Sequence, residues 1–329
     1  MDNSTELLAT SAIPGSRDLS TSIIYTVFGI FGIVGNGLVL LVIAQVENLR
    51  GVTNLFIANQ SVIDFSSSIV LIANFVVPLP HLPSDQPILA EFLCRFWYTK
   101  YFFWSLIVAS SLNLVLMTLP MRYRSYTNTR RLKFVAVLPW MIGFLFQLAV
   151  VCYTILEDNQ CVLYWSYWEP VFFKVFGSMA VFLEFLLPLI VIIIVYSSIA
   201  VRLSHSCQRS EVKLDPLSRS KKVVDYRNRA TKNIIKTMMF VSIFFIICWF
   251  LNQVVVFALI SWGGNVDPNG ILYRISVFMG FGNMCINPII YSFQYHWFQK
   301  GLKKLFCKNR RGIQSQAIET VSGTTKNKP

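Results

Sequence analysis

Seven long stretches without a charged residue divide this 329-residue chain, and they constrain its fold more than any other feature. A helix rises about 1.5 Å per residue, so about 20 mostly apolar residues are needed to cross a bilayer. The stretches are Leu19–Val46, Phe65–Ser84, Tyr101–Met121, Phe134–Leu156, Phe185–Val201, Thr237–Val266 and Ile275–Gln299. The fifth is short, but it continues past a lone acid, Glu184, to Val175. We therefore predict an all-α membrane protein built as a seven-transmembrane helix bundle.

The composition agrees, because 54% of the residues are hydrophobic and 14% are charged. We expect helices over about Thr21–Ala44, Asn54–Pro78, Arg95–Leu119, Leu132–Tyr153, Val171–Leu203, Ala230–Ile260 and Leu272–Phe293. Trp297–Cys307 interleaves Trp, Phe and Leu with Lys at helical spacing, which predicts a short amphipathic helix on the membrane surface. The expected domains are an extracellular segment (1–20), the bundle (21–296), this helix (297–307) and a cytoplasmic tail (308–329).

Positive charge is concentrated on one side of the predicted membrane. Of 29 Lys and Arg residues, 24 lie in every second connection and in the tail, at Arg50, Arg122–Lys133, Arg202–Lys236 and Lys300–Lys328. Cytoplasmic loops carry such an excess, so we expect a multi-pass plasma-membrane protein with its N-terminus outside and its C-terminus in the cytosol. The basic clusters then face membrane lipids and protein partners, and the net charge of +13 does not indicate nucleic acid.

Isolated polar residues inside the predicted spans are candidate functional residues, because a polar group in lipid is costly. They are Asn36, Asp64, Asn283 and Asn287. No Lys or Arg lies at the depth of Asp64, so this carboxyl group is protonated, paired or bound to an ion. Oxygens of the asparagines and of Ser110 or Ser111 would suit a sodium ion at Asp64. The alternative is a neutral aspartic acid in a hydrogen-bonded core network.

The last span contains Asn287-Pro288-Ile289-Ile290-Tyr291, with a proline in the helix interior. Pro288 frees a carbonyl one turn earlier and kinks the helix. Taken alone, this is an ordinary proline kink. The ordered series across the chain is more specific: Gly35-Asn36, Asn54-Leu55 through Asp64, Trp140, Pro188 with Tyr196, Cys248-Trp249 and Asn287–Tyr291. The chain thereby resembles the rhodopsin-like (class A) G protein-coupled receptors over about Thr21–Cys307.

The resemblance implies roles for individual residues. Asp64 would be the sodium-site carboxylate, with Asn283 and Asn287 beside it. Phe245 and Trp249 would be rotating aromatics beneath the ligand pocket. Tyr196 and Tyr291 would approach each other on activation.

Two departures from the family pattern affect the assignment of signalling. The family ends helix three with an acid-Arg-aromatic triplet, whereas this chain reads Thr118-Leu119-Pro120-Met121-Arg122-Tyr123. Either Arg122 is the triplet arginine, or the triplet is absent and Pro120 belongs to the following loop; we favour the second because proline suits a loop. The other departure is Leu251, where the sixth helix of the family carries its kink proline.

The cysteines and one sequon predict modifications. Cys94 begins the third helix on the outer face and Cys161 lies in the long outer loop, where the compartment is oxidising. The family has this disulfide, and we expect it here rather than two free thiols. Cys307 closes the amphipathic helix and is a candidate for palmitoylation. Asn3-Ser4-Thr5 is a candidate glycosylation site.

The ligand class is less well determined. Amine receptors of the family carry an Asp in the outer third of helix three, where Tyr101–Ser105 has no acid, and opsins carry a Lys that Phe278–Phe281 lacks. The polar and aromatic candidates for the outer cavity are Lys100, Tyr101, Trp104, Lys174, Glu184, Trp249 and Asn252. Glu184 either meets a cationic ligand group or pairs with a neighbouring helix. The acidic outer loops favour a basic peptide or a cationic molecule.

We expect a receptor, not an enzyme, that binds an extracellular ligand and activates heterotrimeric G proteins through outward movement of helix six. The G protein would bind near Tyr196, Lys232, Lys236 and Tyr291, with Arg122 if it is the triplet arginine. Arrestin and a receptor kinase are further expected partners. One alternative is a receptor-fold protein that is non-signalling or arrestin-biased. A transporter or channel is less favoured, because seven spans show no inverted repeat.

Overall fold

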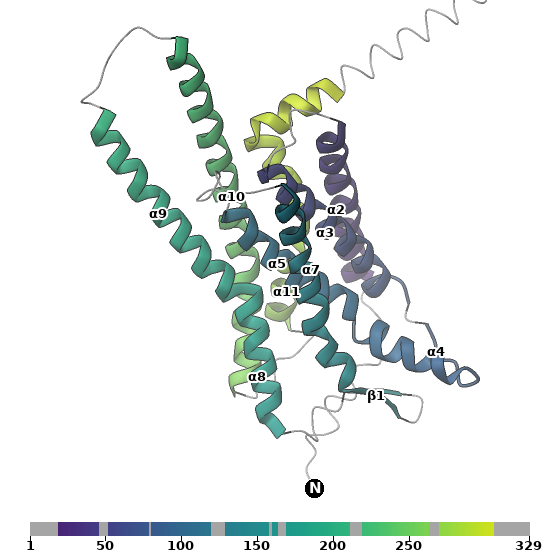
Figure 1. Cartoon of the computed structure of the whole chain (residues 1–329). Helices are drawn as coiled ribbons and strands as arrows, with labels where there is room; N and C mark the ends of the chain where they lie inside the picture. The colour runs from purple at the N-terminus through teal and green to yellow at the C-terminus, as the bar shows by residue number, and fades with distance from the viewer. Residues whose placement is uncertain are drawn as a thin grey trace, which may run out of the picture.

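The computed structural model describes residues 19–45, 52–78, 80–119, 129–157, 160–163, 169–210, 219–262 and 270–305. Its elements are, in chain order, α2 (Leu19–Gln45), α3 (Val52–Phe75), α4 (Pro87–Phe92), η3 (Leu93–Tyr98), α5 (Tyr101–Thr118), α7 (Thr129–Cys152), β1 (Thr154–Glu157), β2 (Gln160–Leu163), α8 (Glu169–Val181), η4 (Phe182–Leu186), α9 (Leu187–Ser210), α10 (Arg219–Trp262) and α11 (Ile271–Gln294). A short helix over residues 296–305 follows α11. Figure 1 shows the long helices side by side, with the β1–β2 hairpin at one end of the bundle and this short helix at the other.

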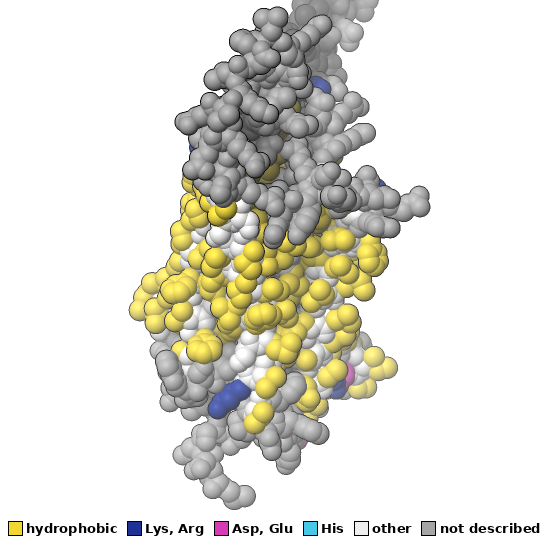
Figure 2. Space-filling model, turned by 60° about the vertical axis from the view of Figure 1, so that its left-hand side comes forward, with side chains coloured by type: hydrophobic (Ala, Val, Ile, Leu, Met, Phe, Trp, Pro, Cys, Tyr) yellow, Lys and Arg dark blue, Asp and Glu magenta, His cyan; other side chains and the backbone are white. Residues whose placement is uncertain are grey.

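Seven helical spans in the described part of the chain are long and apolar enough to cross a membrane, as the sequence predicted. Their outward faces are apolar: Val34 is 64% exposed, Phe134 66% and Ile193 56%. Figure 2 shows hydrophobic side chains over the middle of one face, with Lys and Arg at its margins. An apolar surface of this extent is unfavourable in water and favourable against lipid tails. The prediction of a seven-transmembrane bundle is therefore confirmed.

Helix α5 is the central element of the bundle. It contacts α3, α7, α9 and α10, and most of its side chains are buried. Helix α2 packs on α3 and α11, and α10 packs on α11. Two glycines permit close approach of the helices: a Cβ at Gly143 would collide with the α5 backbone at Ser105, and one at Gly32 with the Ser68 side chain. Small residues at such interfaces let helices in a membrane pack backbone to backbone.

The third span differs from the sequence prediction. It runs over Pro87–Thr118, so it begins eight residues before the expected Arg95. The prediction from uncharged stretches missed this outer extension because the extension contains Glu91 and Arg95. Their side chains bond to each other at 2.7 Å, one helical turn apart. The span is also interrupted: η3 is π-helical, and Lys100 lies in the left-handed region at φ 57°. A left-handed lysine costs conformational energy, so the surrounding structure must hold it.

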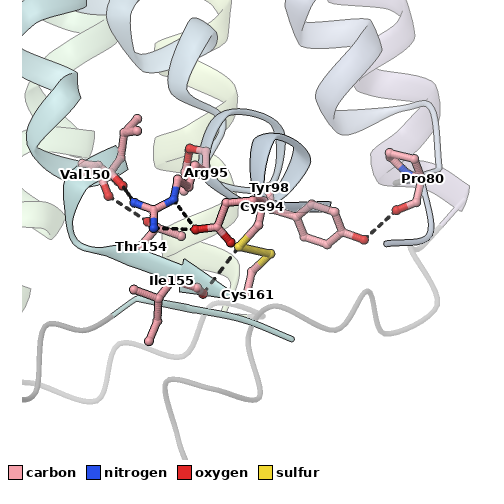
Figure 3. The surroundings of a disulfide bond; sticks show 11 residues. Pro80, Cys94, Arg95, Tyr98, Val150, Thr154, Ile155 and Cys161 are labelled. Atoms are coloured by element: carbon pink, nitrogen blue, oxygen red, sulfur yellow. Dashed lines mark hydrogen bonds and ion pairs between the residues drawn. A yellow bond between two sulfur atoms is a disulfide. The ribbon is translucent and has the colours of Figure 1, made fainter. Parts of the chain in front are cut away.

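A disulfide fixes the outer loop to this span. Cys94 in η3 is bonded to Cys161 in β2, which confirms the predicted disulfide. Strand β2 pairs with β1 in an antiparallel hairpin that the sequence did not predict. Figure 3 shows Arg95 beside the disulfide, where its guanidinium donates to the Val151 carbonyl at 3.0 Å. The disulfide therefore holds the hairpin across the end of the bundle, and Arg95 joins the same span to the end of α7.

Candidate functional site

A buried polar network surrounds Asp64 in the middle of the bundle. Asp64 is 1% exposed, and its carboxylate accepts hydrogen bonds from three side chains. Asn287 of α11 donates to Oδ2 at 2.8 Å; Gln60 of α3 donates to Oδ1 at 2.9 Å, and Ser110 of α5 to the same oxygen at 3.4 Å. Three helices that are distant in sequence therefore meet at one carboxyl group.

The network continues through amide side chains that the sequence analysis did not single out. Gln60 also donates to the Ser110 hydroxyl at 2.6 Å and accepts from Asn113 at 2.8 Å. Asn59 donates to Asn113 at 2.7 Å and accepts from the Trp140 indole at 3.1 Å. The chain of hydrogen bonds therefore extends from α11 through α3 and α5 to α7. The four-residue spacing of Gln60 and Asp64, which places both on one helix face, was the available signal.

Asn36 makes a second polar contact, with a carbonyl that Pro288 leaves free. Because proline has no N–H, Pro288 leaves the carbonyl of Met284 without its partner inside α11. Asn36 of α2 donates to that carbonyl at 2.9 Å and to the Gly32 carbonyl of its own helix at 3.0 Å. A Cβ at Gly35 would lie 3.0 Å from the Pro288 ring, so α2 and α11 are in close contact here. Asn36 thus supplies the donor that the proline removes.

Several buried side-chain oxygens on α2, α3, α5 and α11 have no hydrogen-bond partner among the described residues. They include those of Asn36, Ser67, Ser111 and Asn287. One carboxylate with neutral oxygens is a ligand set that suits a small hard cation such as sodium. Asn283 is buried one turn before Asn287 but does not hydrogen-bond to Asp64 in this structure. The donor set therefore fits sodium through Asp64, Ser110, Ser111 and Asn287.

Glu184 forms a polar contact nearer the hairpin end. Glu184, in the π-helical η4, is 7% exposed and accepts a hydrogen bond from Gln253 of α10 at 3.1 Å. Glu184 thus pairs with a neighbouring helix, which is one of the two alternatives drawn from the sequence. The partner is neutral, so the pairing leaves the acid available for a cationic group. The predicted ligand candidate Asn252 is half buried, and its neighbour Gln253 makes the contact with Glu184.

Lys100 lies beside a cluster of aromatic side chains. Its ammonium group is 4.5 Å from the centre of the Phe75 ring, within range of a cation–π interaction. The rings of Tyr25, Phe75 and Phe281 are edge to face at 5.2 to 5.6 Å. Phe103 of α5 joins them at 5.1 Å from Phe75. Aromatic side chains from α2, α3, α5 and α11 therefore fill this side of the bundle.

The remaining ligand candidates are spread over different surfaces. Tyr101 donates its hydroxyl to the Phe144 carbonyl at 2.9 Å and so joins α5 to α7. Trp104 is half buried and lies edge to face with Phe103 at 5.3 Å. Lys174 is exposed in a shallow groove on α8 and η4 with Val175 and Phe182, which are half exposed. The structure therefore does not place Lys174 in a common cavity with Glu184, because this face of α8 points outward.

The aromatic residues assigned to switching lie on α10 and its neighbours. The Phe245 and Trp249 rings are 6.4 Å apart, and a Cβ at Gly280 of α11 would be 3.9 Å from the Trp249 ring. The Tyr196 hydroxyl oxygen lies 3.4 Å from the Ser242 hydroxyl oxygen. The Tyr291 hydroxyl is buried and has no partner among the described residues. Tyr196 and Tyr291 are therefore not bonded to each other in this structure.

Three predictions concern residues outside the described part of the chain. They are Asn3, the Pro120–Tyr123 segment with Arg122, and Cys307. The two interpretations of Arg122 both remain open. Helix α5 ends at Thr118, and Leu119 keeps helical backbone angles after it.

The fold is that of an integral membrane protein with seven membrane-capable spans among the described residues, and comparison with known sequences identifies its family. The model of the 7 transmembrane receptor (rhodopsin family) matches residues 35–291. The chain belongs to this family, whose members are receptors and not enzymes. It is a G protein-coupled receptor and a multi-pass protein of the plasma membrane.

Several curated relatives are similar over nearly the whole chain. Galanin receptor 2b of Danio rerio is 26% identical over 320 residues, which cover 92% of this chain and 79% of the relative. Somatostatin receptor type 2 of Mus musculus is 26% identical over 302 residues, which cover 86% of this chain and 76% of the relative. Somatostatin receptor type 5 of Rattus norvegicus is 25% identical over 333 residues, which cover 95% of this chain and 85% of the relative.

Proposed function

We propose that this receptor is activated by an extracellular peptide and that α10 transmits the signal to a heterotrimeric G protein. The relatives named as galanin and somatostatin receptors support a peptide ligand. The acidic outer connections support a basic one, because opposite charge attracts the ligand to the opening. Glu184 is then the residue that receives a cationic group of the ligand, in exchange for its bond to Gln253.

The orientation supports the same function. The Cys94–Cys161 disulfide lies at the hairpin end of the bundle, and disulfides persist in oxidising compartments. We therefore place this end outside the cell and the 296–305 helix in the cytosol. The exposed Lys303 and Lys304 of that helix then face anionic lipid, and Cys307 stays a predicted palmitoylation site. Arrestin and a receptor kinase are further proposed cytosolic partners.

The observation that carries the proposal is the hydrogen bond between Asp64 and Asn287. It joins α3 to the segment of α11 that Pro288 interrupts, so a change at this carboxyl group changes the packing of both helices. Asp64, Ser110, Ser111 and Asn287 would hold a sodium ion, whose charge would compensate the buried carboxylate. Ligand binding near Trp249 then favours a state in which the cytosolic end of α10 swings outward.

Nucleotide exchange on purified G proteins tests this function. The receptor in lipid nanodiscs is exposed to galanin, somatostatin and a library of basic peptides, and exchange is measured on a panel of G proteins. We expect at least one peptide to accelerate exchange. Glu184→Gln keeps the size of the side chain and removes its charge. It should lower the affinity for a cationic ligand about tenfold or more. A peptide that binds without accelerating exchange on any G protein would favour the non-signalling or arrestin-biased alternative.

A further inference from the structure

Side-chain hydrogen bonds join α10 to neighbouring helices at three levels in the described part of the bundle. The outer level is Gln253 with Glu184 of η4, and the middle level is Ser242 with Tyr196 of α9. The third level lies at the opposite end from the hairpin, where Asn233 contacts the junction between α11 and the 296–305 helix. Movement of α10 away from the bundle must break these bonds.

Asn233 bonds to both sides of that junction with one amide group. Its Nδ2 donates to the Gln294 carbonyl at 2.8 Å, and its Oδ1 accepts from the His296 backbone N–H at 3.0 Å. The last carbonyls of a helix and the first N–H groups of the next have no partner within their own helices. Gln294 is the last residue of α11 and His296 the first residue of the 296–305 helix. Asn233 therefore caps two helices at once from a third.

The junction is itself fixed to the bundle on its other side. Tyr295, between the two capped residues, donates its hydroxyl to Asn54 of α3 at 2.6 Å, and both side chains are buried. The Tyr295 backbone is extended, at φ −93° and ψ 91°, which presents the Gln294 and His296 groups toward α10. The junction is thus bonded to α3 on one side and to α10 on the other.

We propose that Asn233 is a positioning residue that holds α10 in its closed position and thereby sets the basal activity of this receptor. This inference rests on the proposed function, because it places the junction at the G-protein end. Outward movement of α10 leaves both capped backbone groups without their protein partner, so the double cap favours the closed state. Since the cap uses backbone atoms of α11 and the following helix, it does not require the Arg122 segment.

Basal nucleotide exchange without ligand tests the proposal with a graded set of variants. Asn233→Ala removes both bonds and should raise basal exchange about tenfold, the effect of two hydrogen bonds of ordinary strength. Asn233→Asp keeps an acceptor for the His296 N–H but places a second oxygen against the Gln294 carbonyl, so it should also raise exchange. His296→Pro removes one N–H at a first helical position, where proline is tolerated, and should give a smaller increase.

Gln299→Ala is the matched control. Gln299 donates to the Ser292 carbonyl at 3.0 Å and to the Phe293 carbonyl at 2.9 Å, so it ties the 296–305 helix to α11 without contacting α10. This variant should leave basal exchange unchanged. If Gln299→Ala raises exchange as much as Asn233→Ala, general loosening of the junction explains the effect. Wild-type basal exchange in a folded Asn233→Ala receptor would also overturn the proposal.

A distance measurement separates this proposal from the proposed function. Spin labels at Met239 and Lys304, both exposed, report the separation of α10 from the 296–305 helix. In Asn233→Ala without any G protein the distance distribution should broaden to longer values, while in Gln299→Ala it should match the wild type. An unchanged distribution in Asn233→Ala would reject the double cap as the restraint. If the distance distribution changes but no G protein shows nucleotide exchange, the double cap stands as a restraint on α10 and the proposed coupling to G proteins is rejected.

Discussion

At the scale of single residues, Asp64 has more partners than its position in an apolar run suggested. A polar residue in a hydrophobic span is visible in the sequence, so Asp64 and Asn287 could be predicted as members of a site. Gln60 could have been found from its four-residue spacing to Asp64. Asn113 could not, because nothing in the sequence shows which face of α5 meets α3. Gln253 was missed for a related reason: it adjoins Asn252, and the rotation of α10 decides which of the two is buried.

Replacement of Asp64 by Asn tests the sodium site without a ligand. We expect sodium chloride to raise the unfolding temperature of the ligand-free receptor above its value in potassium chloride, because an ion that binds the folded state stabilises it. Asp64→Asn removes the charge and should abolish the difference between the salts. Thermal unfolding in nanodiscs at equal ionic strength measures both values. Equal stability of the wild type in the two salts would favour the neutral-acid alternative.

At the scale of helices, the positions of the spans were predictable and their irregularities were not. Apolar runs of sufficient length have a single favourable structure in lipid, which explains the agreement for α2, α3, α7 and α11. The break at Lys100 contains neither glycine nor proline, so no local signal announced it. It depends on contacts such as the one between the Lys100 ammonium and Phe75. Helix α10 begins at Arg219, eleven residues before the expected start, in a stretch whose charges suggested a loop.

A double-mutant cycle tests the pairing of Asn36 with the carbonyl that Pro288 frees. Asn36→Ala leaves the buried Met284 carbonyl without this donor and should cost about 1 to 3 kcal/mol of stability. In Pro288→Ala, residue 288 regains an N–H that can bond to Met284 within α11. Asn36→Ala should therefore cost less in that background, with a coupling energy of about 1 kcal/mol. Chemical unfolding of the four proteins gives the cycle, and additive costs would contradict the pairing.

At the scale of the whole molecule, the proposed function depends on α10. It carries Phe245 and Trp249, and it contacts α8, η4, α9, α5 and α11. No proline interrupts its 44 residues, so its backbone hydrogen bonds are continuous and it can move as one body. The sequence shows that Leu251 replaces the family's proline, but it does not show that α10 is continuous over its whole length. The side-chain hydrogen bonds of this helix join residues from three separate spans, and only the folded bundle brings them together.

The separation of α10 from α7 is the most direct test of this mechanism. Spin labels at Met239 and Phe134, both exposed to lipid, are introduced while the Cys94–Cys161 bond is kept. Distances are measured in nanodiscs for the receptor alone, with the most effective peptide, and with peptide and nucleotide-free G protein. We predict a longer distance in the G-protein complex, with a minor population of that distance in the peptide-bound receptor. A distance that stays the same in all three states, while the G protein is bound, would contradict outward movement of α10.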